Sequence, residues 1–335
     1  MDDLRLESFV ECVPNFSEGA DTTTLDLIAG AIDSSTGAWL LDHSADPDHG
    51  RSVYTLAGYP GRVMSAMDAA VAVAVERIDM RTHAGHHPRI GAVDVIPFVP
   101  LGDTTMEQCV AGARSFAERL ADRFDMPVFL YREAAVKPER RVLAAVRRPG
   151  FDGLAQAMAR DGGAPDFGPS RPHPTAGATA IGARPFLIAW NIQLTSTDVT
   201  VAQRIAARIR ERDGGMVAVQ ALGIELPSQG CVQLSMNILD FERAPLWQVW
   251  AEADRLAAQE RVSLLDSELI GLAPARALAD VADHIGSASF HTAEQRLHEA
   301  AGHLRIRRFD PSMVLEVRLA QARGQGGDDA SSRSD

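Results

Sequence analysis

Three histidines lie within five residues of one another, at His83, His86 and His87, and Pro88 and Arg89 follow them directly. Because a proline disfavours helical backbone at the preceding residue, this segment is predicted to be a loop. An imidazole titrates near neutral pH, so a histidine in this loop suits a general base that accepts and then returns a proton. Histidines in loops are also often exposed or structural, and that interpretation stays open.

A second polar segment, residues 42–51 (DHSADPDHGR), follows a short apolar run. Its acids could hold a cationic substrate group or orient a histidine, but Asp-Pro-Asp and His-Gly are equally typical of turns. The spacing alone favours a turn. A zinc site is the other alternative, although the sequence matches no established zinc spacing. Its ligands would come from His83, His86, His87, His43, His49, Asp46 and Asp48.

The composition argues against several classes of protein. Among 335 residues, 45 acids and 33 basic residues give a formal charge of −12, which does not suit a nucleic-acid surface. The longest apolar run, residues 69–75, is far too short to cross a membrane, and the first residues lack the pattern of a leader. Cys12, Cys109 and Cys231 are too few for a disulfide framework. We therefore expect a cytoplasmic protein that binds neither nucleic acid nor membrane.

The basic residues are almost all arginine, since Lys137 is the single lysine of the chain. Genomic base composition explains this bias at most positions. A guanidinium is nevertheless a planar donor that fits a carboxylate, so an acidic small-molecule substrate would find suitable partners.

Apolar periodicity predicts the element order βαββαβ twice. In the first half, strands are expected at residues 8–14, 38–42, 52–58 and 93–99, and helices at 22–33 and 60–78. In the second half, strands are expected at residues 186–194, 217–223, 232–239 and 262–269, and helices after Asp198 and at 245–259. Each half resembles a ferredoxin-like unit, whose sheet has one bare face. We predict an α+β fold of two ferredoxin-like βαββαβ subdomains, with mixed sheets packed face to face and helices outside.

The predicted subdomains cover residues 1–180 and 181–323, and a disordered tail follows at 324–335. A helix at 105–124 and a strand at 127–131 extend the first unit, and Thr104 and Glu107 have the spacing of a capping box. Residues 162–177 lie between the two halves and are rich in Gly, Pro and Ser. By composition alone they are a linker.

Longer motifs carry a family resemblance. Residues 11–19 (ECVPNFSEG) and 78–100, which include HPRIGAVDVIPFVP, resemble the opening signature and the active-site block of the glutamate formimidoyltransferases, also called glutamate formiminotransferases. Further matches are residues 165–169 (PDFGP), 182–184 (GAR), 235–237 (SMN) and 267–272 (SELIGL). The motifs occur in order from residue 11 to about residue 280, so the resemblance covers most of the chain.

The resemblance implies a transferase that moves a formimino group between N-formimino-L-glutamate and tetrahydrofolate, giving L-glutamate and 5-formiminotetrahydrofolate in histidine degradation. Tetrahydrofolate would be a co-substrate, and no metal is expected. The family also implies two subdomains around a folate-binding cleft, and a homodimer. In animals the domain is fused to a cyclodeaminase, whereas this chain is expected to be monofunctional, without that second domain.

The resemblance also implies roles for individual residues. His87 aligns with the family's catalytic base, which would remove a proton as folate N5 attacks the formimino carbon. Acids would stabilise the cationic intermediate, and arginines would hold substrate carboxylates. The candidates are Asp42, Asp46 and Asp48 for the acids, Arg51 and Arg89 for the carboxylates, and Asn15 for the pterin or the formimino group.

Folate binding is implied for the connecting segment, which replaces the linker interpretation. Its residues are Gly168, Pro169, Ser170, Arg171, Pro172, His173, Pro174, Thr175, Ala176 and Gly177. Four residues depart from the family pattern: Ser44 and His86 stand where acids are common, Gly50 where Asn is common, and Ala176 where an aromatic residue can stand. Ser44 stays a candidate contact, with Asp46 or Asp48 as its substitute.

Three alternatives remain open on the sequence. A related folate-dependent transferase with a different amino-acid donor or acceptor would explain the four departures. A zinc-dependent hydrolase would use His83, His86 and His87. A folate-binding module without turnover is the non-enzyme alternative, and the retained His87-Pro88-Arg89 motif argues against it.

Overall fold

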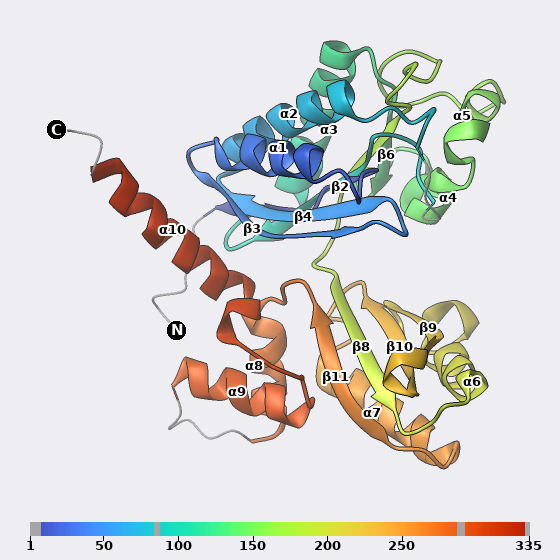
Figure 1. Cartoon of the computed structure of the whole chain (residues 1–335), viewed down its shortest axis with the longest axis vertical. Coiled ribbons are helices and arrows are strands. Elements are labelled where there is room, and N and C mark those ends of the chain that lie inside the picture. The colour runs from blue at the N-terminus through green and yellow to red at the C-terminus, as the bar shows by residue number, and fades with distance from the viewer. Residues whose placement is uncertain (1–7, 84–87, 287–291, 332–335) are drawn as a thin grey trace. The chain divides into compact units, whose positions relative to one another are not determined.

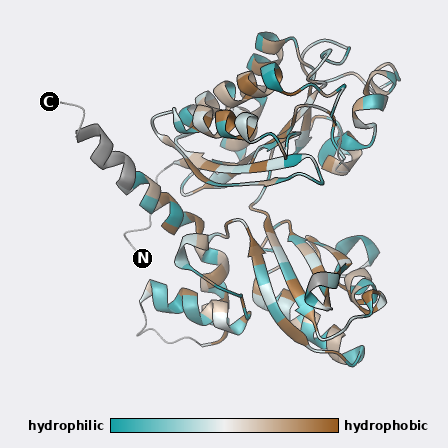
Figure 2. Cartoon of the chain, viewed as in Figure 1, coloured by the Kyte–Doolittle hydropathy of each residue, from teal (hydrophilic) through white to brown (hydrophobic). Residues whose placement is uncertain are grey.

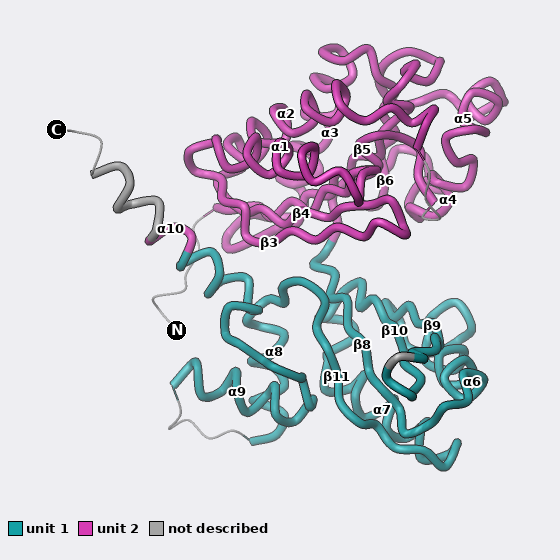
Figure 3. Tube along the Cα trace, in the orientation of Figure 1, with its two compact units in different colours: residues 1–4, 185–321 teal, residues 5–184, 322–335 magenta. Residues whose placement is uncertain are grey.

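The computed structural model describes residues 8–83, 88–286 and 292–331, and the chain divides into two compact units (Figures 1 and 3). Of the described residues, 8–83, 88–184 and 322–331 form the N-terminal unit, and 185–286 and 292–321 form the C-terminal unit. The subdomain limits expected from the sequence stay a prediction. Of the expected tail, residues 324–331 belong to the helix α10 (Leu315–Ser331).

The N-terminal unit is built on a seven-stranded mixed sheet. Its strands are β1 (Phe9–Cys12), β2 (Asn15–Phe16), β3 (Ala38–Asp46), β4 (Arg51–Gly58), β5 (Val93–Leu101), β6 (Val128–Arg132) and β7 (Thr179–Ala183). Strand β4 pairs with β3 and with β1 and β2, and these in turn pair with β5, all antiparallel. Strands β7 and β6 then extend the sheet in parallel. Val13 and Pro14 interrupt the first strand, since proline has no N–H for the ladder.

Three long helices cover one face of this sheet: α1 (Thr22–Asp33), α2 (Pro60–Arg77) and α3 (Met106–Phe124) (Figure 1). Ile28, Met67 and Phe116 are fully buried between the helices and the strands. The capping box of α3 is formed by Thr105 and Gln108. The prediction that Thr104 and Glu107 form it was therefore wrong by one residue, because both pairs have the same spacing.

Two short helices, α4 (Leu143–Arg147) and α5 (Gly150–Met158), belong to a second apolar cluster on the opposite face. Side chains alternate between the faces of a strand, and β6 shows this directly. Leu130 packs in the core under α1 to α3, whereas Phe129 and Tyr131 pack with Leu154 of α5. The strand residues of this cluster come from β5, β6 and β7.

The C-terminal unit contains a four-stranded antiparallel sheet in the order β11-β8-β10-β9. Its strands carry both apolar and polar residues (Figure 2). The elements are β8 (Ile188–Leu194), α6 (Val199–Ile209), β9 (Val219–Leu226), β10 (Cys231–Ile238), α7 (Leu246–Gln259), β11 (Leu264–Ile270), α8 (Ala275–His284), α9 (Ala293–His303) and α10 (Leu315–Ser331).

The two units share one strand order. In chain order, the second strand pairs with the third, the third with the first, and the first with the fourth, in β3-β4-β1-β5 as in β9-β10-β8-β11. The predicted α+β class with two ferredoxin-like units is confirmed. The mixed character holds for the N-terminal sheet, whereas the C-terminal sheet is antiparallel throughout. The face-to-face packing of the sheets stays a prediction.

Candidate active site

Of the three clustered histidines, His83 lies within the described residues, and His86 and His87 lie outside them. His83 is half-buried, and its Nε2 lies 3.0 Å from the carbonyl oxygen of Gly50 at the start of β4. Burial and the charge of Arg89 lower the pKa of His83, so its neutral form is favoured. The role of His87 as general base stays a prediction.

The segment that carries these histidines is hydrogen-bonded to the proposed folate segment on both sides of the histidine cluster. The Met80 N–H donates to the Thr175 carbonyl at 2.9 Å, and the Ala92 N–H donates to the Ala176 carbonyl at 2.9 Å. Gly91 lies so close that a Cβ would be 2.1 Å from the Ala178 carbonyl oxygen. Residues about 90 positions apart along the chain therefore meet.

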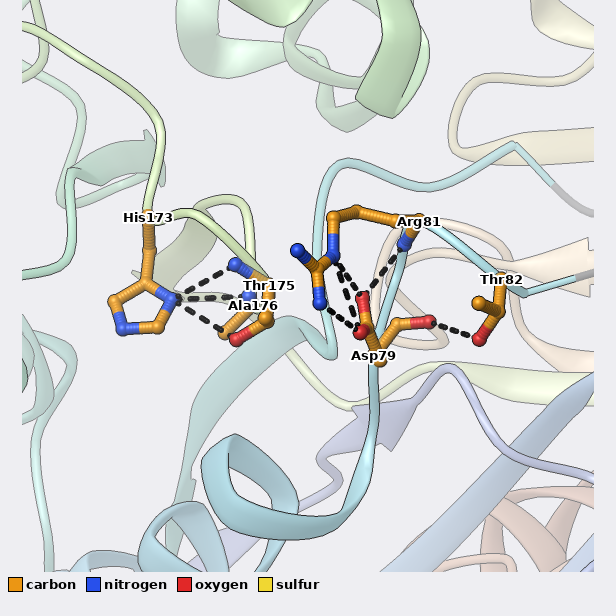
Figure 4. A network of polar contacts seen from close by, with 6 residues as sticks. All are labelled: Asp79, Arg81, Thr82, His173, Thr175 and Ala176. Carbon is orange, nitrogen blue, oxygen red and sulfur yellow. Dashed lines mark hydrogen bonds and ion pairs between the residues drawn. The ribbon is translucent and has the colours of Figure 1, made fainter.

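His173 fixes the shape of the proposed folate segment (Figure 4). Its Nδ1 accepts the backbone N–H of Ala176 at 3.0 Å and that of Thr175 at 3.3 Å. His173 and Gly177 also exchange two backbone hydrogen bonds, of 2.7 and 3.1 Å. An Nδ1 that accepts two N–H groups carries no proton, and burial lowers the pKa of His173 in agreement.

Ion pairs also lie just before the histidine cluster and just before the folate segment. Asp79 and Arg81 form an exposed ion pair of 2.5 Å before the histidine cluster (Figure 4), and the Arg81 guanidinium lowers the pKa of Asp79 to about 2. Asp166, just before the folate segment, is buried against Arg140 at 2.6 Å and accepts the Leu130 N–H at 2.8 Å. The segment therefore starts from a fixed point on β6.

Asn15 and Arg51 lie together on the sheet face opposite α1 to α3. Asn15 is opposite Val53 in the register of β2 and β4, which places Arg51, two residues from Val53, on the same face. Arg51 donates from Nε (3.0 Å) and Nη2 to the amide oxygen of Asn15. Burial lowers the pKa of Arg51, and the nearby charge of Arg147 lowers it further.

The three candidate residues of β3 share this face. Asp42, Ser44 and Asp46 stand opposite Thr55, Val53 and Arg51 of β4, after a bulge at Leu41. The exposed Asp46 accepts the His49 backbone N–H at 3.0 Å and contacts the His49 Nδ1 at 2.6 Å. These bonds lower the pKa of Asp46. They also close the turn between β3 and β4. The turn prediction is therefore confirmed for residues 47–50, whereas residues 42–46 continue β3 beyond its expected end at Asp42.

The opening motif joins the turn to the histidine segment. The Ser17 hydroxyl donates to the Gly91 carbonyl at 2.7 Å. Glu18 accepts three successive backbone N–H groups, from Gly19 to Asp21, at 2.8 to 2.9 Å. A Cβ on Gly19 would lie 2.1 Å from the Asp46 carbonyl oxygen, so glycine is required there for close backbone approach.

Sequence reasoning missed a buried ion pair, Asp94 with Arg147. Asp94 of β5 is 3% exposed; its Oδ1 accepts the Ile90 N–H at 3.1 Å and its Oδ2 contacts Nη2 of Arg147 at the end of α4. Burial raises the pKa of Asp94 and Arg147 opposes this. An acid inside an apolar strand is a signal for a buried partner, but no local pattern marks Arg147.

The described residues contain neither a candidate metal-binding group nor a helix that could span a membrane. No group of three His, Cys, Asp or Glu side chains in residues 8–83, 88–286 and 292–331 is arranged to hold a metal ion. Two histidines of the zinc alternative lie outside these ranges, so the expectation of no metal stays a prediction. Within the same ranges, no helix is both long enough and apolar enough to cross a bilayer.

The structure is therefore an α+β protein of two units. In its N-terminal unit, the histidine segment and the proposed folate segment are hydrogen-bonded to each other, and polar side chains of β2, β3 and β4 share one sheet face. The sequence matches the formiminotransferase domain, N-terminal subdomain, over residues 9–184, and the formiminotransferase domain over residues 189–313. The chain belongs to the formiminotransferase family, and it is accordingly a transferase.

Curated relatives extend this match. The chain is 41% identical to a glutamate formimidoyltransferase of Streptococcus pyogenes, over 83% of this chain and 93% of that protein. It is 40% identical to a glutamate formimidoyltransferase of Thermoplasma acidophilum, over 94% and 98%. It is 43% identical to the formimidoyltransferase-cyclodeaminase of Rattus norvegicus, over 83% of this chain and 52% of that longer protein.

Proposed function

We propose that this protein transfers a formimino group between N-formimino-L-glutamate and tetrahydrofolate. The observation that supports this most is the 40 to 41% identity, over most of both chains, to two relatives named glutamate formimidoyltransferase. The joined histidine and folate segments agree with it, because they bring the two motifs of the resemblance into one place. Tetrahydrofolate is thus a co-substrate, and no metal takes part.

In this reaction, N5 of tetrahydrofolate attacks the formimino carbon and forms a C–N bond. His87 takes the proton that N5 loses and returns it to the glutamate nitrogen as the old C–N bond breaks. The tetrahedral intermediate carries positive charge on its nitrogens, so a carboxylate stabilises it. Asp42 suits this role better than Asp46, because the Asp46 carboxylate already closes the turn with His49.

The remaining groups bind and orient. Arg51 and Arg89 hold substrate carboxylates, and Asn15 hydrogen-bonds the pterin or the formimino group. The segment from Gly168 to Gly177 contacts the folate mainly through exposed or half-buried residues, since Ala176 and Gly177 are buried. The reaction belongs to histidine degradation in the cytoplasm, and the active form is a homodimer.

The test is an incubation of N-formimino-L-glutamate, tetrahydrofolate and micromolar folded enzyme, with both products followed by mass spectrometry. Formation of L-glutamate and formiminotetrahydrofolate in equal amounts is expected. The His87→Ala variant should lose about a hundredfold or more in rate. The matched control is His303→Ala, an exposed histidine at the end of α9. No transfer by the unsubstituted enzyme would refute the proposal, and full activity of His87→Ala would move the base elsewhere.

A further inference from the structure

The buried carboxylate of Asp94 interacts with several guanidiniums. Arg147 is ion-paired with it, and the charges of Arg51 and Arg89 both interact with it. Three guanidiniums thus share one buried anion. The side chains of Asp94 and Arg147 are 4% and 14% exposed, so solvent screens this cluster weakly.

Arg51 differs from Arg147 in its partner. The guanidinium of Arg51 donates hydrogen bonds to the amide oxygen of Asn15, which carries no charge. The charge of Arg147 repels Arg51, whereas Asp94 attracts it and Asp46 attracts it less strongly. The Asp46 carboxylate is exposed and bonded to His49, so Asp94 is the buried anion that can compete for Arg51. Arg51 therefore keeps a positive charge that a neutral hydrogen-bond partner does not cancel.

A buried ion pair is seldom retained for stability alone, because the desolvation of both charges offsets their attraction. Within the described residues, Nε of Arg147 is buried and has no hydrogen-bond partner, which adds to this cost. The pair nevertheless joins three parts of the site: β5, Ile90 next to Arg89, and the end of α4. Its position indicates a role in the site.

We propose that Arg147 is a positioning residue of a carboxylate subsite at Arg51: by pairing with Asp94, it keeps this buried anion from neutralising Arg51. A carboxylate of a glutamate-bearing ligand then binds the charge that Arg51 retains. This inference rests on the proposed function for the identity of the ligand. It adds to that function a residue that never touches the substrate and yet sets the affinity for its carboxylate.

The test compares glutarate, which has two carboxylates, with glutaramide, which has the same carbon skeleton and no charge. Binding is measured by calorimetry on the full chain. Arg147→Met frees Asp94 to pair with Arg51, so the affinity for glutarate should fall by about tenfold or more. The weak affinity for glutaramide should not change. Arg148→Met is the matched control, since Arg148 is exposed and adjacent on the chain.

A second variant separates this role from a purely structural one. In Asp94→Asn/Arg147→Met the competing anion is gone, while the Asn oxygen still accepts the Ile90 N–H. Glutarate affinity should recover to within about threefold of the unsubstituted protein. In turnover, KM for N-formimino-L-glutamate should rise in Arg147→Met and recover in the double variant, with little change in kcat.

Three results would overturn the inference: no glutarate binding by the unsubstituted protein, equal losses for glutarate and glutaramide, or no recovery in a double variant that remains folded. The binding assay needs no turnover. Glutarate binding without formimino transfer would therefore refute the proposed function and leave the subsite, and transfer without the Arg147 effect would do the opposite.

Discussion

Replacing Gly91 by alanine should separate the histidine segment from the folate segment. The new Cβ would lie 2.1 Å from the Ala178 carbonyl oxygen and 2.4 Å from the Ala176 carbonyl oxygen. Both neighbours are backbone atoms, so no flexible side chain can move aside. The two segments must shift apart, and the hydrogen bonds beside Gly91 must lengthen or break.

The size of the effect follows from those bonds. The Ala92 N–H donates to the Ala176 carbonyl at 2.9 Å, and the Ala178 N–H donates to the Ile90 carbonyl at 3.0 Å. Each contributes about 1 kcal/mol net. Losing both lowers the free energy of local opening by about 2 kcal/mol, which corresponds to about thirtyfold faster amide exchange at these residues.

Hydrogen exchange followed by mass spectrometry measures this directly, in peptides that contain Ala92 and Ala178. Formimino transfer should fall in parallel, because the two segments form one site. Gly30→Ala is the matched control: its Cβ meets nothing within 4 Å in α1, and alanine favours a helix. Unchanged exchange in Gly91→Ala would show that the close contact at Gly91 does not hold the segments together.

Two further predictions concern single side chains of the same unit. The pKa of His173 is lowered in the folded state, so the loop should be stabilised above about pH 6.5 and lose protection as the pH falls. Exchange of residues 168–177, corrected for intrinsic rates, should show this loss, and His173→Asn, which keeps an acceptor but does not titrate, should abolish the pH dependence. Asn15→Ala leaves the half-buried guanidinium of Arg51 without its acceptor, so denaturant unfolding of the N-terminal unit should show a loss of about 2 kcal/mol; an unchanged midpoint and slope would contradict this.

The element order was predictable because its signals are local. Leu25, Ile28 and Ile32 recur at helical spacing and are buried along one side of α1. Pro60 stands in the first turn of α2, where its missing N–H costs nothing. The same reasoning missed β7, which pairs with β5 and with β6, both in parallel. Its partners lie about 50 and 85 residues earlier, and no turn next to β7 sets its register.

Local features of the site were predictable from the sequence, whereas its long-range contacts depend on packing. The turn from Asp46 to His49 is local chemistry, and the structure contains it. The hydrogen bonds of Met80 and Ala92 with residues 175–176 lie beside a close backbone contact at Gly91. The sequence marks that contact only by a glycine. The family resemblance supplied it, because related chains share the packing as well as the motifs.

Charge shows the limit of composition most clearly. The formal charge of −12 describes the chain as a whole, but Arg51, Arg89 and Arg147 share a single buried carboxylate at Asp94. In a chain whose basic residues are arginine except for Lys137, composition cannot identify which guanidinium faces that anion. Burial decides which arginines interact strongly with Asp94. The low dielectric of the interior strengthens charge–charge interactions within the buried cluster, whereas solvent and salt screen the interactions of exposed arginines. An acidic protein can therefore present a positive subsite to a dicarboxylate, and the charge of Arg51 depends on whether Asp94 is already occupied by Arg147.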